Sequence, residues 1–200
     1  NLEKNDTELK MQKIRTELVI IGGSAGSLHV ILDLVRGLER KLDFPIVLVI
    51  HRKAQSTSIL QSLLQQFTDK QVIEIEDKTE IENDKIYIAP ADYHLLFDSK
   101  TNLSLDRSEK HHFSRPSIDI SFVSASQVYK ENLLAILLSG ANADGIYGLK
   151  YIKNNNGKIW IQDPETAEVD YMPRHAKEQV AYDLLINPEK LCININQLNI

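Results

Sequence analysis

The stretch LVIIGGSAGS, residues 18–27, decides the fold that we expect for this chain. Its first four residues are apolar and include β-branched side chains, which is typical of a buried strand in a parallel sheet. A glycine pair that begins at Gly22 ends this strand, and apolar residues at helical spacing over residues 29–42 predict a helix directly after it. Ser24 lies between Gly22 and Gly26 in a G-x-S-x-G arrangement. A turn of this kind would hold the serine hydroxyl above the sheet, beside the free N–H groups of a helix N-terminus.

The G-x-S-x-G arrangement alone leaves more than one interpretation open. Small neighbours would give a substrate access to a nucleophilic Ser24. They would equally suit a tight strand-to-helix turn in which Ser24 caps the helix, or a phosphate cradle formed by residues 22–27. A dinucleotide site is disfavoured, because the G-x-G-x-x-G pattern is not satisfied and no acidic residue ends the second expected strand.

Strand and helix patterns alternate along the rest of the chain, which predicts the α/β class. Further strands are expected at residues 45–50, 72–75, 85–89, 133–138 and 158–162, and helices at residues 56–67, 116–129, 147–153 and 173–180. One more strand and a closing helix are expected within residues 181–200, and a small antiparallel hairpin within residues 92–107. We therefore predict a doubly wound, mostly parallel sheet with helices on both faces.

The composition favours one domain in a reducing compartment. The chain has 200 residues, 42% of them hydrophobic, which suits a single core, and we expect residues 16–200 to form one domain after a polar tail or linker stub at residues 1–15. No apolar run is long enough to span a bilayer, and Cys192 is the only cysteine, so we predict a cytoplasmic protein without membrane insertion. A net charge of −5 without a long basic run disfavours nucleic-acid binding.

Three polar residues follow expected strands and could form a catalytic triad. His51 comes directly after residues 45–50, and Asp144 lies in the small-residue loop after residues 133–138. Because the carboxyl ends of parallel strands lie along one edge of a sheet, both side chains can meet Ser24 there. An imidazole can take the serine proton while a carboxylate fixes its tautomer. The order Ser, His, Asp differs from the order in α/β-hydrolases, in which the histidine comes last.

Four other histidines do not predict a metal site. His29, His94, His111 and His112 follow no buried strand closely, and their spacing forms no zinc signature with a thiolate or an H-E-x-x-H pattern. The segment KHHFSR, residues 110–115, is the nearest approach to a basic cluster, and we interpret it as a solvated loop. We therefore expect no metal site, and hydrolysis by a serine, a histidine and an aspartate requires neither a metal nor an organic cofactor.

Six segments, taken in order, resemble the recurring blocks of the catalytic domain of CheB-type chemotaxis receptor methylesterases. They are VIIGGSAGS, VLVIH, YIAPADYHL, SRPSID, LLSGANADG and YMPRHA, and together they span most of residues 18–187. The resemblance implies a bacterial serine hydrolase that demethylates glutamate methyl esters on the cytoplasmic signalling helices of chemoreceptors and releases methanol. Deamidation of selected glutamines is a second activity that it implies.

The resemblance also assigns roles by position. It implies that Ser24 is the nucleophile, His51 the general base and Asp144 the residue that orients His51. The backbone N–H groups that it places at the oxyanion hole are those of Ala25, Ala141 and Asn142. The residues that it places at the substrate cleft are Arg115, Met172 and Pro173. Arg115 would suit an acidic receptor surface, and an ordinary surface ion pair is its alternative role.

Three features depart from the family pattern. Ala141 and Asn142 stand where the loop usually reads T-G-M-G-x-D-G, Tyr171 replaces a glycine, and no receiver domain precedes the expected catalytic domain. A regulatory domain, fused or separate, would then be a partner. The altered loop motivates a second hypothesis, a catalytically weakened receptor-binding or scaffold module. A phosphate or nucleotide binder through residues 22–27 is the third.

Overall fold

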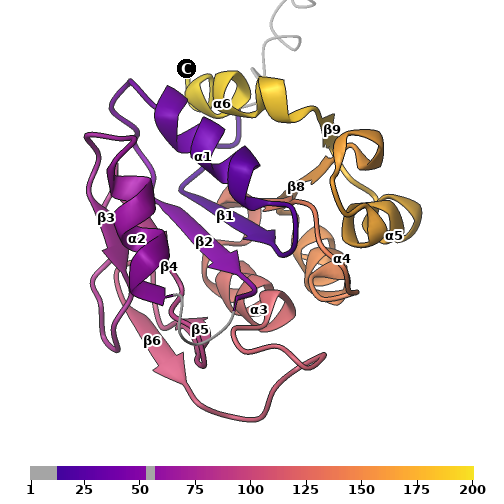
Figure 1. Ribbon diagram of the computed structural model, residues 1–200, viewed down its shortest axis with the longest axis horizontal. Helices are drawn as coiled ribbons and strands as arrows, with labels where there is room; N and C mark the ends of the chain where they lie inside the picture. The colour runs from indigo at the N-terminus through magenta and orange to yellow at the C-terminus, as the bar shows by residue number, and fades with distance from the viewer. Residues whose placement is uncertain (1–12, 53–56) are drawn as a thin grey trace, which may run out of the picture.

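The computed structural model describes residues 13–52 and 57–200, and its centre is a parallel sheet of seven strands in the order β3-β4-β2-β1-β7-β8-β9 (Figure 1). The strands are β1 (Leu18–Gly23), β2 (Ile46–Ile50), β3 (Val72–Glu74), β4 (Ile86–Ile88), β7 (Leu133–Leu137), β8 (Lys158–Gln162) and β9 (Leu184–Ile186). A separate antiparallel pair is formed by β5 (His94–Phe97) and β6 (Leu103–Asp106). The predicted fold class is therefore confirmed.

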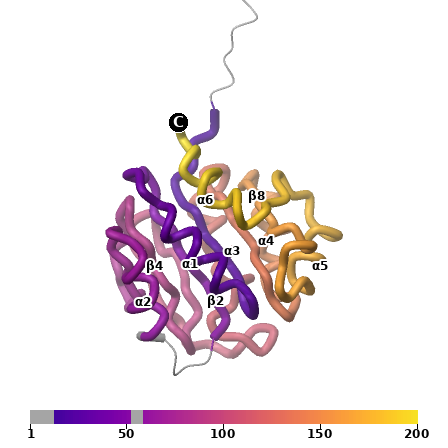
Figure 2. Tube along the Cα trace, turned by 45° about the horizontal axis from the view of Figure 1, so that its top comes forward, coloured from indigo at the N-terminus to yellow at the C-terminus, as the bar shows by residue number. Residues whose placement is uncertain are grey.

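Helices cover both faces of the sheet. One face packs against α1 (Leu28–Gly37), α2 (Thr57–Gln65) and α6 (Pro188–Asn196), and the other against α3 (Ile118–Tyr129), α4 (Ile146–Asn154) and α5 (Tyr171–Gln179). Short 3-10 helices lie at Lys130–Asn132 and Pro164–Thr166. Figure 2 shows α2 and β4 at one side of the molecule and α4 and α5 at the other, with α1 between them.

The central strand β1 is buried on both faces, which explains its uninterrupted apolar sequence. Because side chains alternate along a strand, Val19 and Ile21 point into the core under α1, while Leu18 and Ile20 point into the core under α3. All four side chains are fully buried. The sheet thus holds the end of β1 rigidly between two layers of helices.

Several element boundaries differ from the prediction. The helix after β1 ends at Gly37, although the apolar spacing continues to Leu42, which is buried in the connection to β2. Pro116 was expected in the first turn of its helix, but α3 begins at Ile118 with Ser117 as its N-cap. The Ser117 hydroxyl accepts a hydrogen bond from the N–H of Ile120, so the cap defines the start of the helix.

No helix within the described ranges is long and apolar enough to cross a bilayer.

Most of the predicted tail, residues 1–12, and Ser56, the first residue of the helix expected at residues 56–67, lie outside the described residues. The segment that precedes β1 contacts the rest of the domain, because the side chain of Arg15 pairs with that of Asp43 at 2.5 Å.

Candidate active site

The register of the three central strands brings their ends to one edge of the sheet. Strand β1 lies between β2 and β7, and the ladder of hydrogen bonds continues past the strand ends. The N–H of His51 donates to the carbonyl of Gly23 at 3.0 Å, and the N–H of Ser24 donates to the carbonyl of Ser139 at 2.9 Å. Ser24, His51 and the loop after β7 are therefore neighbours, as the sequence predicted for strand ends.

The turn after β1 depends on glycine. A Cβ atom on Gly22 would lie 2.6 Å from Cγ2 of Ile118, so only glycine allows α3 to pack this closely on the strand. The left-handed residue of the turn is Gly26, at φ +81°, whereas Ser24 is not among the described residues with positive φ. The N-cap of α1 is Ser27, whose hydroxyl donates to the Ser24 carbonyl at 2.7 Å. The interpretation that Ser24 caps the helix is therefore wrong.

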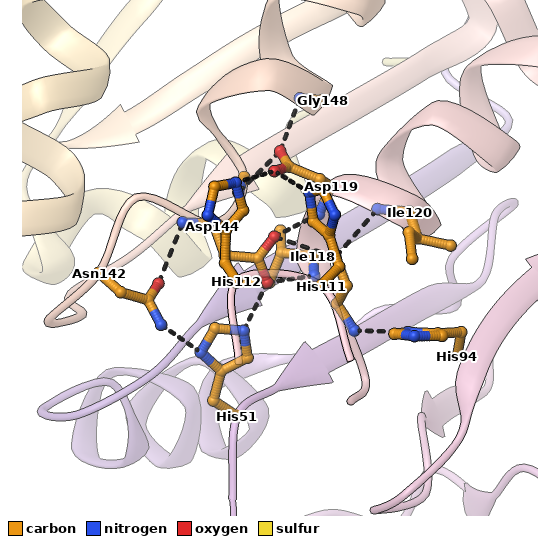
Figure 3. Close-up of polar contacts among 12 residues, drawn as sticks. His51, His94, His111, His112, Ile118, Asp119, Ile120, Asn142, Asp144 and Gly148 are labelled. Carbon is orange, nitrogen blue, oxygen red and sulfur yellow. Dashed lines mark hydrogen bonds and ion pairs between the residues drawn. The ribbon is translucent and has the colours of Figure 1, made fainter. Parts of the chain in front are cut away.

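His51 and Asp144 form a short hydrogen bond. Nε2 of His51 lies 2.6 Å from Oδ2 of Asp144, and the dashed line between them in Figure 3 marks this contact. The Asp144 carboxylate is fully buried, and the His51 side chain is only 10% exposed. The same carboxylate accepts the backbone N–H groups of Ile118 at 2.6 Å and Asp119 at 2.8 Å, and the hydroxyl of Ser117 at 3.1 Å. It therefore lies at the N-terminus of α3.

These contacts explain how a buried carboxylate keeps its charge. Burial by itself raises the pKa of Asp144, but the hydrogen bond from His51 and those from the N–H groups of Asp119 and Ile118 more than offset it. The pKa of Asp144 consequently lies below its usual range. An ionised Asp144 accepts a hydrogen bond from Nε2–H of His51. In the neutral ring, Nδ1 is then the nitrogen without a proton and can act as the acceptor.

Ser24 and His51 line the same pocket, which has a volume of about 340 Å³. Its apolar wall includes Ile50 and Leu60. Within the described residues, no hydrogen bond joins the Ser24 hydroxyl to His51. The structure thus places the hydroxyl and the imidazole in one cavity, and the imidazole and the carboxylate in direct contact.

Asn142 contacts both His51 and Asp144. Its Nδ2 lies 3.4 Å from Nδ1 of His51, and its Oδ1 accepts the N–H of Asp144 at 3.0 Å (Figure 3). The amide therefore lies next to the ring nitrogen that is not bound to Asp144. The sequence drew attention to Asn142 only for its backbone and for its departure from the family pattern, so this side-chain role was missed.

The residues expected at the oxyanion hole, Ala25, Ala141 and Asn142, have backbone N–H groups for which no acceptor is found among the described residues. Ala25 lines the pocket that contains Ser24. Ala25 and Ala141 are both exposed residues.

Ser139 is a buried side chain that the sequence did not single out. Its Oγ donates to the carbonyl of Ala25 at 2.7 Å and accepts the N–H of Val169 at 2.9 Å. Its own N–H donates to Oε1 of Gln162 at 3.0 Å. Ser139 thus links the turn after β1 to the segment before α5 through hydrogen bonds. The only available signal was a hydroxyl at the end of an apolar strand.

Arg115 lies beside His51 but is already paired. It lines a pocket of about 260 Å³ together with His51, and its Nη2 lies 2.5 Å from Oδ1 of Asp92. Its Nη1 donates to the carbonyl of Ser108 at 2.9 Å, and its side chain is only 15% exposed. Of the two roles considered for Arg115, the structure thus favours the ion pair over a free charge that faces a partner.

Met172 and Pro173 lie under the loop after β7. Both are buried in the first turn of α5, and the N–H of Met172 donates to the carbonyl of Gly140 at 3.0 Å. A Cβ on Gly140 would lie 2.6 Å from Cε of Met172 and 3.0 Å from Cβ of Ser24. Met172 therefore supports the loop from the core side. Tyr171 is 43% exposed and packs on the ring of His175.

Comparison with known proteins identifies the family. A family model described as CheB methylesterase matches residues 19–195. The chain belongs to the CheB methylesterase family. Its structure matches the crystal structure of the Thermotoga maritima CheB methylesterase catalytic domain with a TM-score of 0.86 and 29% identity, covering 91% of this chain and 98% of that one. The resemblance drawn from the sequence blocks is therefore confirmed, together with the methylesterase class.

Relatives of different lengths belong to the same CheB family. A Leptospira interrogans protein, provisionally named a protein-glutamate methylesterase/protein-glutamine glutaminase, is 38% identical over 187 residues, which are 92% of this chain and 97% of that protein. A Thermotoga maritima protein-glutamate methylesterase/protein-glutamine glutaminase is 31% identical over 182 residues, but these are only 53% of its length. This chain therefore spans nearly all of the first relative and about half of the second.

Proposed function

We propose that the protein hydrolyses glutamate methyl esters on chemoreceptors, with Ser24 as nucleophile, His51 as general base and Asp144 as the residue that orients His51. The observation that carries the proposal is the 2.6 Å contact between the buried Asp144 and His51, which lines one pocket together with Ser24. The names of the relatives support the substrate class and add deamidation of protein glutamine as a second activity.

The first half of the reaction forms an acyl-enzyme. Nδ1 of His51 takes the proton of Ser24 as the Ser24 oxygen attacks the carbonyl carbon of the ester. The carbonyl oxygen becomes an oxyanion, which the N–H of Ala25 and an N–H of the loop at Ala141 and Asn142 stabilise. The bond to the methoxy group then breaks, and His51 returns the proton to it, so methanol leaves. Asp144 stabilises the imidazolium throughout.

The second half regenerates Ser24. Water gives a proton to Nδ1 of His51 and attacks the acyl carbon, and a second oxyanion forms in the same place. The bond to the Ser24 oxygen breaks, Ser24 recovers its proton from His51, and the glutamate carboxylate is released. With a glutamine side chain, the leaving group would be ammonia in place of methanol.

The partners that we propose are the methylated cytoplasmic helices of chemoreceptors, and the location is the cytoplasm. The Thermotoga relative is about twice as long as the region it shares with this chain, which supports a regulatory domain as a further partner, fused or separate. We also propose that residues 16–200 act as one catalytic domain, since the family match runs from residue 19 to residue 195.

Methanol release from a labelled receptor tests the activity. A receptor methylated with a radiolabelled methyl donor should lose its label to volatile methanol when the protein is added. Ser24→Ala should abolish release and leave the melting temperature unchanged, because no described residue hydrogen-bonds the Ser24 hydroxyl. Ser99→Ala, in the turn of the β5–β6 hairpin, is the matched control and should release methanol at the wild-type rate.

The same assay separates the competing hypotheses. A protein that binds the methylated receptor but leaves its label intact, beside a Thermotoga CheB that removes it, would favour the weakened receptor-binding or scaffold module. Saturable nucleotide binding that is lost in Gly26→Ala, without ester hydrolysis, would favour the phosphate or nucleotide binder.

A further inference from the structure

Two neighbouring histidines point at one buried carboxylate outside the pocket of Ser24. Nε2 of His111 lies 3.2 Å from Oδ2 of Asp119, and Nε2 of His112 lies 3.6 Å from the same oxygen (Figure 3). The three ligand atoms lie within 4.8 Å of one another. We call these residues the His-His-Asp cluster. Asp119 is 2% exposed, whereas the two histidine side chains are 42% and 47% exposed.

An unusual turn aims both imidazoles in the same direction. Residues next to each other in an extended chain point to opposite sides, but His112 and Phe113 both have positive φ, at 48° and 63°. The turn is closed by two hydrogen bonds between the backbones of His111 and Ser114, at 3.1 and 2.9 Å. Left-handed conformations cost energy in residues other than glycine, so the surrounding contacts must hold this one in place.

The two histidine-to-carboxylate separations in the His-His-Asp cluster match those of a metal site. Zinc binds histidine nitrogen at about 2.0–2.1 Å and carboxylate oxygen at about 2.0–2.2 Å, so two ligands of a tetrahedral ion lie roughly 3.4 Å apart. The two histidine-to-carboxylate distances, 3.2 and 3.6 Å, lie on either side of this value. Two imidazoles and a carboxylate are also a ligand set that zinc uses in proteins with an open fourth position.

The charge around Asp119 also favours a cation. Oδ1 of Asp119 accepts the N–H groups of Gly145 at 2.9 Å and Gly148 at 2.8 Å, which leaves Oδ2 directed at the imidazoles. Asp119 is 2% exposed, so a positive ion at Oδ2 would compensate a negative charge that lies away from solvent. The N–H contacts of Oδ1 would meanwhile orient the carboxylate, as second-shell contacts of metal ligands do.

We propose that His111, His112 and Asp119 bind one divalent transition-metal ion, with Zn²⁺ as the best match, through Nε2, Nε2 and Oδ2. His111 and Asp119 also line a pocket of about 450 Å³ between the β5–β6 hairpin, α3 and Tyr147, so there is room for a water or a small anion as fourth ligand. Imidazole ligands select transition ions over Mg²⁺ and Ca²⁺, which prefer oxygen. The proposal does not depend on the esterase activity.

Calorimetric titration with Zn²⁺ tests the site on the full chain, prepared without a histidine tag. We expect saturable binding of one ion per chain and none of Mg²⁺ at the same concentrations. His111→Ala and His112→Ala should each weaken binding at least ~10-fold, since even second-shell changes commonly cost 10–100-fold. His29→Ala removes another exposed histidine and is the matched control, which should bind as the wild type does.

Cobalt provides a second measurement. Co²⁺ should give the intense visible absorption of a four-coordinate ion in the wild type, and this absorption should disappear in the His111→Ala/His112→Ala double variant. Both histidines are partly exposed, so we expect these variants to fold, whereas Asp119→Asn would disturb the start of α4. Absence of saturable Zn²⁺ binding, or equal binding by the wild type and the double variant, would overturn the proposal.

Discussion

Asp119 and Asp144 cap each other's helices. Asp144 directly precedes the N-cap of α4, yet its carboxylate accepts the N–H groups of Ile118 and Asp119 at the start of α3. Asp119, in the first turn of α3, accepts the N–H groups of Gly145 and Gly148 at the start of α4. Each buried charge thus lies at the positive end of a helix dipole. The exchange joins the two helices and fixes the loop from which Asp144 reaches His51.

The first prediction is that Asp144→Asn loses both stability and activity. All contacts to the two carboxylate oxygens come from donors, so an amide NH₂ in either orientation would face another donor. We expect a loss of about 3–5 kcal/mol in the free energy of unfolding, as for other broken buried charge pairs. Methanol release should fall by about 10³–10⁴-fold. Denaturant unfolding and the labelled-receptor assay measure the two effects.

Ser24→Ala is the matched control for this variant, because it should lose activity without losing stability. An Asp144→Asn protein that hydrolyses the ester at more than a tenth of the wild-type rate would contradict the proposed role of Asp144.

The second prediction concerns how the difference in unfolding free energy between the wild type and Asp144→Asn depends on pH. The pKa of Asp144 is lowered in the folded protein, so its charge stabilises the fold above the unfolded-state pKa of about 3.9. This contribution is lost as the pH falls through the lower, folded-state pKa. The difference in unfolding free energy between wild type and Asp144→Asn should therefore shrink as the pH falls below about pH 4. Urea unfolding from pH 7 to pH 3 measures it, and a difference independent of pH would contradict the prediction.

Parts of the site were predictable because they follow strands directly. Continuous apolar runs predicted that β1 and β2 are buried on both faces, and the parallel arrangement placed Ser24 and His51 at one edge. Asp144 is farther from its strand, and the chemistry of a triad, together with the family resemblance, indicated that it reaches His51. The reciprocal capping with Asp119 was not predictable, because a sequence does not show which helix N-terminus a carboxylate will meet.

The His-His-Asp cluster shows a different limit of sequence analysis. Metal signatures are recognised by ligand spacing on helices or strands, whereas His111 and His112 are brought together by a turn with positive φ at two residues that are not glycine. Histidine is enriched at positive φ but adopts it in only a small share of cases, and phenylalanine is not enriched, so the sequence does not predict this turn. Arg115 was likewise expected either to face an acidic partner or to form an ion pair. The sequence could not name Asp92 as its partner, because the two residues meet only through tertiary contacts.

The third prediction is that Gly26→Ala destabilises the turn that carries Ser24. The left-handed backbone alone costs a residue with a Cβ about 1–2 kcal/mol, and the new Cβ would lie 2.7 Å from Oγ of Ser139. We expect a loss of stability of at least this size, together with reduced methanol release per folded molecule. Gly37→Ala is the control, since its Cβ would meet only the side chain of Cys192 and its φ is not positive. Equal effects of the two substitutions on activity would refute the prediction.

The fourth prediction is that Asn142→Ala increases the rate of ester hydrolysis. Nδ2 of Asn142 lies 3.4 Å from Nδ1 of His51, the atom that must accept the proton of Ser24. The amide therefore competes with the hydroxyl for the same lone pair. A hydrogen bond of this length is at the weak end of the usual 0.5–1.5 kcal/mol, which corresponds to a rise in kcat of about twofold.

Asn142→Asp provides the opposite test of this competition. It keeps an oxygen to accept the N–H of Asp144, as Oδ1 of Asn142 does at 3.0 Å, but puts a negative charge beside the ring. That charge favours the imidazolium, in which Nδ1 carries a proton and cannot act as a base, so activity at neutral pH should fall. Asn102→Ala, in the β5–β6 turn, controls for the loss of an asparagine. A tenfold loss of activity in Asn142→Ala would mean that the amide orients His51, and the competition would then be refuted.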